Sequence, residues 1–196
     1  AQDEPAARSA AFPAATTAPA TGEKFSYRDL IQPSPYPVRF AESDGLRIAY
    51  ETVSSSERFV ALAEGRTDLH CGPASATLPR RETLDFSILY YVDGAAVAAR
   101  PGGYSEIFDT RKGDVGVLNG TTAVATATDL MTRNSVAGEL KQFGSHGDGL
   151  KALAAGEIQL YVGDQAILLF QIEQLGLEEQ VLVNEGDRVR AAQTVA

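Results

Sequence analysis

The sequence has little from which to build cross-links, membrane spans or basic surfaces. Its 196 residues contain one cysteine, Cys71, so an internal disulfide is excluded. Cysteine usage therefore does not distinguish an oxidising from a reducing compartment. No stretch approaches the roughly 18 apolar residues of a membrane span. Seventeen Lys and Arg against 26 Asp and Glu give a net charge of −9 without a basic run. This balance argues against nucleic acid or an anionic membrane as a partner.

Large apolar side chains are almost missing from residues 1–24, "AQDEPAARSAAFPAATTAPATGEK". Such a composition cannot offset the entropy of ordering, so we expect a disordered tail. The segment lacks the charged start and apolar centre of a signal peptide, but "AQDEP" is typical of what remains after cleavage. We therefore expect a mature, exported chain; the alternative is a chain trimmed within a flexible tail. With no cysteine at its start, we expect no lipid anchor there.

One thirteen-residue stretch occurs twice. "VALAEGRTDLHCG" (60–72) and "KALAAGEIQLYVG" (151–163) share six of thirteen residues without a gap. Each predicts a helix stopped by a glycine, Gly65 or Gly156, and then a short strand, "TDLHCG" (67–72) or "IQLYVG" (158–163). Ser54 with Glu57 has capping-box spacing, and Ser145 with Asp148 can open the second helix. The pair favours two similar α/β lobes, although helix–Gly–strand is also a common connection.

The region between the copies adds further elements. Residues 88–100 are apolar and lack a helical period, and they are long for one strand, so the segment is a candidate crossover between lobes. "VGVLNG" (115–120) predicts a strand running into a turn, and Thr121–Thr122 then opens a helix. The free N–H groups and positive dipole end of a helix N-terminus suit an anion such as a carboxylate.

Polar side chains follow the predicted strands, where open α/β sheets bind ligands. They are Ser75, Thr77 and Arg80 after the first copy, Thr121 and Thr122 in the middle, and Asp164 with His146 at the second copy. An Arg can clamp a carboxylate in bidentate fashion, and an Asp accepts hydrogen bonds from an ammonium group. Together they predict a receptor for a zwitterionic amino acid. Taken singly, Arg80 is equally a surface charge, and Thr121, Thr122 and Asp164 are equally helix caps.

These motifs resemble the solute-binding proteins of ABC transporters for polar amino acids, bacterial extracellular solute-binding proteins of family 3. The resemblance runs from about Leu46 to Leu182, and "VSSSERFVALAEGRTDLHCGPASATLPRRETLDFS" is its most specific part. "VGVLNGTT" and "HGDGLKALAAGEIQLYVGDQAILL" are similar to the family's second-lobe motifs. The resemblance implies an α/β, two-lobed periplasmic-binding-protein-like architecture of type II, in which residues 46–53 form a strand.

The resemblance also implies roles for single residues. Arg80 matches the clamp on the ligand α-carboxylate, and Ser75 matches a residue that touches both head groups. Gly72 matches a carbonyl acceptor for the ammonium group, and Asp164 matches its counter-charge. The second-lobe carboxylate donors correspond to Thr121 and Thr122.

Other matched positions concern the ligand side chain. In relatives that bind glutamate or aspartate, residues at the positions of Ser55, Arg58 and His146 help to hold the side chain. An acidic ligand is thus one expectation, and a half-exposed helix cap is the alternative for His146. "EKFSYRD" resembles the aromatic segment that covers the ligand, with Phe25 and Tyr27 as candidates.

The chain departs from the family pattern in the first lobe. The initial strand and the usual long helix are missing from residues 25–45, and residues 184–196 resemble a polar loop rather than a return crossover. We therefore expect a tail at 1–24, an incomplete lobe one at 25–92, lobe two with the crossover strand at its start at 93–183, and a polar segment at 184–196.

The function implied is that of a periplasmic monomer that binds a small polar amino acid and delivers it to an inner-membrane ABC permease. Neither a cofactor nor a metal is expected. Three alternatives stay open: a cyclohexadienyl-type dehydratase with Glu57, Asp164 or His146 as acid or base, a sensory ligand-binding domain, and a remnant that binds nothing.

Overall fold

The computed structural model of the protein describes residues 49–89 and 92–184, and every structural statement below concerns these residues. The elements are α3 (Arg58–Ala63), α4 (Leu78–Arg81), β1 (Ala95–Ala99), α5 (Gly103–Thr110), β2 (Val115–Leu118), α6 (Ala123–Arg133), β3 (Leu140–Phe143), α7 (His146–Ala155), β4 (Leu160–Asp164), α8 (Gln165–Leu175) and β5 (Leu182–Asn184).

The described chain divides into two compact units. Residues 49–54 and 58–74 form a smaller unit around α3, and residues 55–57, 75–89 and 92–184 form a larger unit. Each unit is described by itself below. The lobe limits expected from the sequence stay a prediction.

A five-stranded mixed sheet forms the centre of the larger unit, in the order β3-β2-β4-β1-β5. β2 runs parallel to both β3 and β4, with Leu118 opposite Phe143 and Val117 opposite Val162. β1 runs antiparallel to β4 and to β5. The strand predicted at "VGVLNG" is β2, and it lies in the parallel half of the sheet with β3 and β4.

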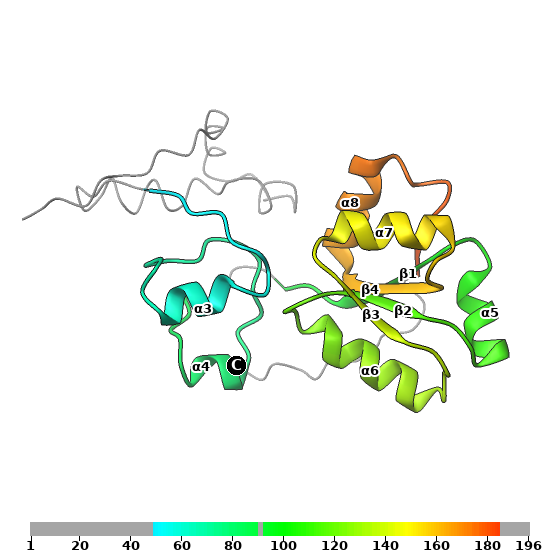
Figure 1. The fold of residues 1–196 in the computed structure, drawn as a ribbon, viewed down its shortest axis with the longest axis horizontal. Coiled ribbons are helices and arrows are strands. Elements are labelled where there is room, and N and C mark those ends of the chain that lie inside the picture. Colours follow the sequence, from blue (N-terminus) through cyan, green and yellow to red (C-terminus); the bar gives the residue numbers. More distant parts are fainter. Residues whose placement is uncertain (1–48, 90–91, 185–196) are drawn as a thin grey trace, which may run out of the picture. The chain divides into compact units, whose positions relative to one another are not determined.

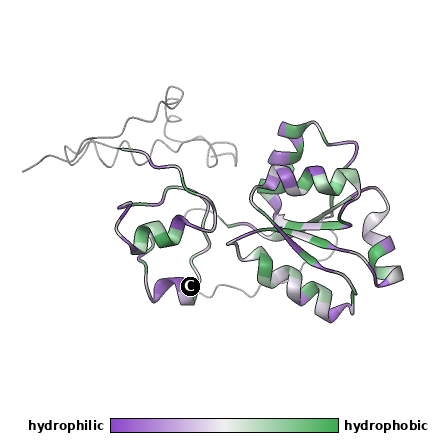
Figure 2. Ribbon diagram, viewed as in Figure 1, coloured by the Kyte–Doolittle hydropathy of each residue, from purple (hydrophilic) through white to green (hydrophobic). Residues whose placement is uncertain are grey.

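Helices cover both faces of this sheet. Apolar residues of α5 and α6 pack with Val97, Val115, Val117 and Val162 on one face. Residues of α7 and α8 pack with Tyr161 on the other, and Figure 1 shows the two layers on opposite sides of the strands. In Figure 2 the helices carry both hydrophobic and hydrophilic residues, as helices with one buried face do. The α/β class is confirmed.

The second copy of the repeat folds as predicted. Ser145 caps α7, since its Oγ accepts from the Asp148 N–H at 3.1 Å. Gly156 ends the helix in the left-handed conformation, with φ of +81°, which a residue with a Cβ adopts only with strain. β4 follows and ends at Asp164. It begins at Leu160, two residues after the start of the predicted strand.

The first copy folds as predicted only in its helix. α3 ends before Gly65, whose φ is +68°, but the predicted strand at 67–72 is wrong, because the described chain has no strand there. The segment turns back on α3 instead, and the Arg66 and Thr67 N–H groups donate to the Ala61 carbonyl at 2.9 and 3.3 Å. A strand needs a neighbour to pair with, and residues 49–89 supply none. The described part of the implied strand at 46–53 is likewise irregular.

The apolar run at 88–100 is shorter as a strand than its composition suggests. Among the described residues of this run, Ala95–Ala99 is the part that pairs in the sheet. Just before it, the Gly94 N–H donates to Asp93 Oδ1 at 2.8 Å, a side-chain turn that competes with strand pairing. The role of this segment as a crossover stays a prediction.

Candidate functional site

The sheet has a topological switch between β2 and β4. These strands are parallel neighbours, but the helices that follow them leave in opposite directions, α6 to one face and α8 to the other. At such a point the two connections diverge beyond the carboxyl ends of the strands and leave room for a ligand. The fold therefore places a candidate site where β2 and β4 end.

The β2–α6 loop forms one side of this edge. Thr121 Oγ1 donates to the Leu118 carbonyl at 2.8 Å, which fixes the turn. Thr122 stands at the N-cap position of α6, but its side chain makes no capping hydrogen bond with the described residues. Neither the Thr121 nor the Thr122 hydroxyl is therefore held by a capping hydrogen bond to α6. Both residues are half-buried at the start of α6, where free N–H groups and the helix dipole favour an anion.

A turn from an earlier part of the chain packs on the same loop. Ser55 Oγ donates to the Asn119 carbonyl at 2.8 Å. Gly120 has φ of +71°, and a Cβ there would lie 2.5 Å from Ser56 Cα, so only glycine fits this approach. Ser55 therefore lies against the loop that leads from β2 to Thr121 and Thr122.

Asp164 ends β4 and occupies the N-cap position of α8, without a side-chain capping bond inside the described chain. A different acid does the capping: Asp93 Oδ2 accepts from the Ala166 N–H at 3.1 Å. The Gly94 carbonyl accepts from the Gln165 N–H at 2.9 Å. Asp164 is therefore the N-cap residue by position, its side chain makes no capping hydrogen bond, and its half-buried carboxylate stands at the strand end.

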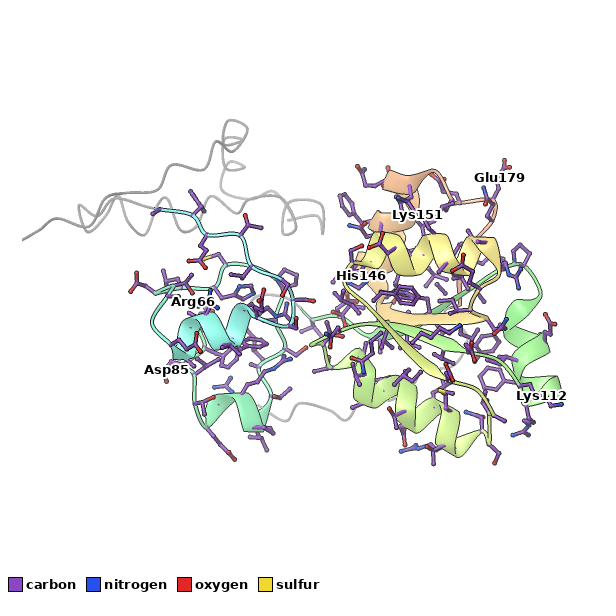
Figure 3. The ribbon with its side chains drawn as sticks, in the orientation of Figure 1. Arg66, Asp85, Lys112, His146, Lys151 and Glu179 are labelled. Atoms are coloured by element: carbon purple, nitrogen blue, oxygen red, sulfur yellow. The ribbon has the colours of Figure 1, made fainter. Side chains whose placement is uncertain are left out.

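His146 is the first residue of α7, beside the ends of the strands (Figure 3). Its Nδ1 lies 3.2 Å from the Tyr161 hydroxyl, and the two rings meet edge to face with centroids 5.9 Å apart. Its Cε1 lies over Gly163, 3.5 Å from where a Cβ would stand. The capping alternative for His146 is wrong, because Ser145 caps the helix.

Tyr161 is a supporting residue that the sequence analysis missed. Its side chain is fully buried, and burial, with the nearby charge of Asp148 adding to it, raises the Tyr161 pKa far above its usual value. The hydroxyl therefore stays neutral and can hold His146 by one ring nitrogen. A single polar group in the otherwise apolar strand "LYVG" is the signal that could have revealed it.

Arg80 lies on the short helix α4, in the larger unit. Its Nη1 donates to the Ser75 carbonyl at 2.9 Å, and partial burial lowers the guanidinium pKa. Thr77 is the N-cap residue of α4, and its N–H also donates to the Ser75 carbonyl, at 3.1 Å. Arg80, Ser75 and Thr77 therefore form one local group, with Arg80 held by the backbone rather than exposed as a simple surface charge.

Two predicted residues belong to the smaller unit. Arg58 Nη1 donates to the Pro73 carbonyl at 3.1 Å, and the guanidinium lies 4.8 Å from the centroid of the Phe59 ring. Gly72 follows His70, whose ring would stand 3.3 Å from a Cβ at Gly72. Phe25 and Tyr27 lie outside the described residues.

One sheet edge thus gathers Ser55, Thr121, Thr122, His146 and Asp164. The described residues contain no group of three or more metal-binding side chains, and none of their helices has the length and apolar character of a membrane span. The residues at this edge of the sheet carry hydroxyl, imidazole and carboxylate groups, which suit recognition of a small polar molecule by hydrogen bonding and charge.

The family of bacterial extracellular solute-binding proteins, family 3, matches residues 38–189. The chain belongs to this family. The family is one of extracellular solute-binding proteins, which is the family that the sequence motifs resemble.

A curated relative is the L-glutamate/L-aspartate-binding protein of Pseudomonas aeruginosa. It is 23% identical over 124 residues, which cover 63% of this chain and 41% of the relative. The chain thus spans well under two thirds of the length of this relative.

Solved structures of the family share the fold. An ancestral arginine-binding protein bound to arginine matches with a TM-score of 0.64 and 23% identity, over 73% of this chain and 63% of that one. The substrate-binding protein of an amino acid ABC transporter matches with a TM-score of 0.66 and 21% identity, over 78% and 65%. The periplasmic-binding-protein-like fold expected from the sequence is confirmed.

Proposed function

We propose that this protein binds a small polar amino acid at the carboxyl ends of β2 and β4 and delivers it to the permease of an ABC transporter. The observation that carries the proposal is the switch point itself. Thr121 and Thr122 start the helix on one side of it, and Asp164 ends the strand on the other. None of the three serves as a side-chain helix cap within the described chain.

The chemistry of the two sides is complementary to a zwitterion. The N-terminus of α6 and its hydroxyls suit the α-carboxylate, with Arg80 as a bidentate partner. Asp164 supplies the negative charge for the ammonium group. Arg58, Ser55, Ser75, Thr77 and Gly72 keep the roles that the family resemblance implies, and Phe25 keeps its role as a ligand cover.

His146 is proposed to contact the ligand side chain. If the Tyr161 hydroxyl donates to Nδ1, the neutral ring carries its proton on Nε2 and offers a donor to the ligand. Such a donor suits a carboxylate or amide oxygen, and the glutamate- and aspartate-binding relative supports an acidic ligand.

We propose that the protein works outside the cytoplasm, in the periplasm, as a monomer. Membership of a family of extracellular binding proteins supports the location, and the ABC transporter named for one solved relative supports the permease partner.

Asp164→Asn is expected to weaken ligand binding about tenfold or more, because it removes the charge that faces the ammonium group. The melting temperature should change little, since the Asp164 side chain makes no capping hydrogen bond to α8. Calorimetric titration measures the affinity, with exposed Asp85→Asn as the control for loss of one charge. Unchanged affinity in Asp164→Asn with an intact fold would contradict the proposed role.

A further inference from the structure

The imidazole of His70 contacts both α3 and the turn at Gly72, within the smaller unit. The His70 ring meets the Phe59 ring of α3 edge to face, with the centroids 6.1 Å apart. A Cβ at Gly72 would stand 3.3 Å from His70 Cε1 and 3.4 Å from Nε2, so the imidazole also lies against this glycine. His70 therefore joins a helix to the turn that follows it in the chain.

Arg58 lies on the same aromatic ring. Its guanidinium carbon is 4.8 Å from the Phe59 ring centroid, and its Nη1 donates to the carbonyl of Pro73, the residue after Gly72, at 3.1 Å. Phe59 is thus in contact with the Arg58 guanidinium and with the His70 imidazole. Arg58 and Gly72 both belong to the ligand-binding set proposed above, and His70 contacts Gly72 and the ring that supports Arg58.

The surroundings of His70 favour a neutral ring. Its Nε2 is buried and has no hydrogen-bond partner among the described residues, so a proton there would leave a charged donor unsatisfied. Arg58 faces it with a positive charge from α3, and on its own segment the Cys71 thiol stays neutral, because partial burial raises the Cys71 pKa. Burial first, and the charge of Arg58 second, lower the pKa of His70 below its ordinary value.

We propose that His70 is a positioning residue for ligand binding: its neutral ring holds Phe59 and Arg58 of α3 against the turn at Gly72, and a proton on the ring disturbs this arrangement and weakens binding. An imidazolium next to the Arg58 guanidinium is relieved by moving towards water, away from Phe59 and Gly72. A ligand ammonium group at the Gly72 carbonyl adds a further positive charge on the same side. The effect on the ligand rests on the proposed function, whereas the arrangement around His70 does not.

Solution NMR of the full chain tests the arrangement without a ligand. The protein has two histidines, and His70→Phe identifies the His70 signal. We expect the His70 ring to titrate below the ordinary midpoint of about 6.5, and the amide signals of Phe59 and Gly72 to move with the same midpoint. In His70→Phe this movement should be lost. A His70 midpoint at or above the ordinary value, or amide signals that do not follow it, would overturn the inference.

Ligand affinity at pH 7.5 tests the positioning role. His70→Ala removes the ring and should weaken binding about tenfold. His70→Phe keeps a neutral ring in place of one whose Nε2 has no partner in the described chain, so it should bind nearly as tightly as the parent. The exposed neighbour Leu69, changed to Ala, is the matched control. Unchanged affinity in His70→Ala, or an equal loss in His70→Ala and His70→Phe, would overturn the role.

The dependence of affinity on pH separates the proton from simple packing. One pH unit below the measured His70 midpoint, about ten in eleven rings carry a proton, so the dissociation constant of the parent should rise about tenfold from its value at pH 7.5. His70→Phe keeps His146 and meets the same ligand charges, so its rise measures every other titration and should be smaller. Equal rises in the two proteins would overturn the effect of the proton.

The probes are L-glutamate, L-glutamine and L-arginine, titrated calorimetrically into the parent and each variant. A weaker His70→Ala, a rescued His70→Phe and a steeper fall of affinity with acid in the parent together support the inference. If the parent binds none of the three, the function proposed above loses its support and the effect on the ligand falls with it. The NMR titration then decides by itself whether His70 holds α3 to the turn at Gly72.

Discussion

The Tyr161 side chain fits beside the site because two of its neighbours are glycines. The Tyr161 ring, which holds His146, lies against Gly116 of β2 and Gly149 of α7. A Cβ on Gly149 would overlap the ring, because protein interiors are packed too closely to absorb an added methyl group. The position of His146 therefore depends on a small residue one turn further along its own helix.

Gly149→Ala is expected to destabilise the protein by about 1–3 kcal/mol, despite the better helix propensity of alanine. Gly147→Ala in the same helix is the matched control. A Cβ there would meet only Ser145 Oγ, at 3.8 Å, so this change should be neutral or slightly stabilising. Urea denaturation compares the two variants. Equal stabilities would show that the Tyr161 ring is not fixed as described.

Sequence reasoning at the residue scale succeeded where the signal is local. Ser145 and Gly156 begin and end α7 as predicted, because capping and left-handed turns depend on a few adjacent residues. It failed for Asp93 and Tyr161, whose partners are 73 and 15 residues away. The roles of the named ligand-binding residues stay predictions, although the structure brings Ser55, Thr121, Thr122, His146 and Asp164 to one edge.

At the scale of elements, the connection between β2 and β3 is fastened by one acid. Asp114 precedes β2, and its Oδ1 accepts from the Glu139 N–H at 2.9 Å while its Oδ2 lies 2.7 Å from Lys141 Nζ. The Glu139 hydrogen bond first, and the Lys141 hydrogen bond second, lower the pKa of Asp114. A lowered folded-state pKa means that the ionised acid stabilises the fold.

This contribution is present above the unfolded pKa of about 3.9 and is lost as the pH falls through the lower folded-state value. Asp114→Asn should therefore be less stable than the parent at pH 7, and the difference should shrink as the pH is lowered below about 4. Urea midpoints of both proteins at pH 7 and pH 3 measure this. A difference that is constant with pH would mean that the charge of Asp114 contributes nothing.

Elements were predicted best where they pair with neighbours described in the same unit. The helix and strand of the second copy form because β4 lies between β2 and β1. The same pattern in the first copy gives only α3, since a strand at 67–72 has no partner among residues 49–89. A helix closes its hydrogen bonds within itself, whereas a strand depends on another part of the chain.

At the scale of the whole molecule, the central claim is that this chain binds an amino acid. Membership of the solute-binding family and the switch point between β2 and β4 both support it. A ligand that binds only the folded state stabilises it by mass action and so raises the melting temperature. At a ligand concentration of a hundred times the dissociation constant, the free energy of unfolding rises by about 2.7 kcal/mol. Such a shift is measurable for a chain of this size.

The most direct test is therefore thermal unfolding of the full chain with each of the twenty amino acids at millimolar concentration. We expect a cooperative transition that one or a few polar amino acids move upward by several degrees, with glutamate or aspartate among the first candidates. A cooperative transition that none of the twenty moves would contradict the account.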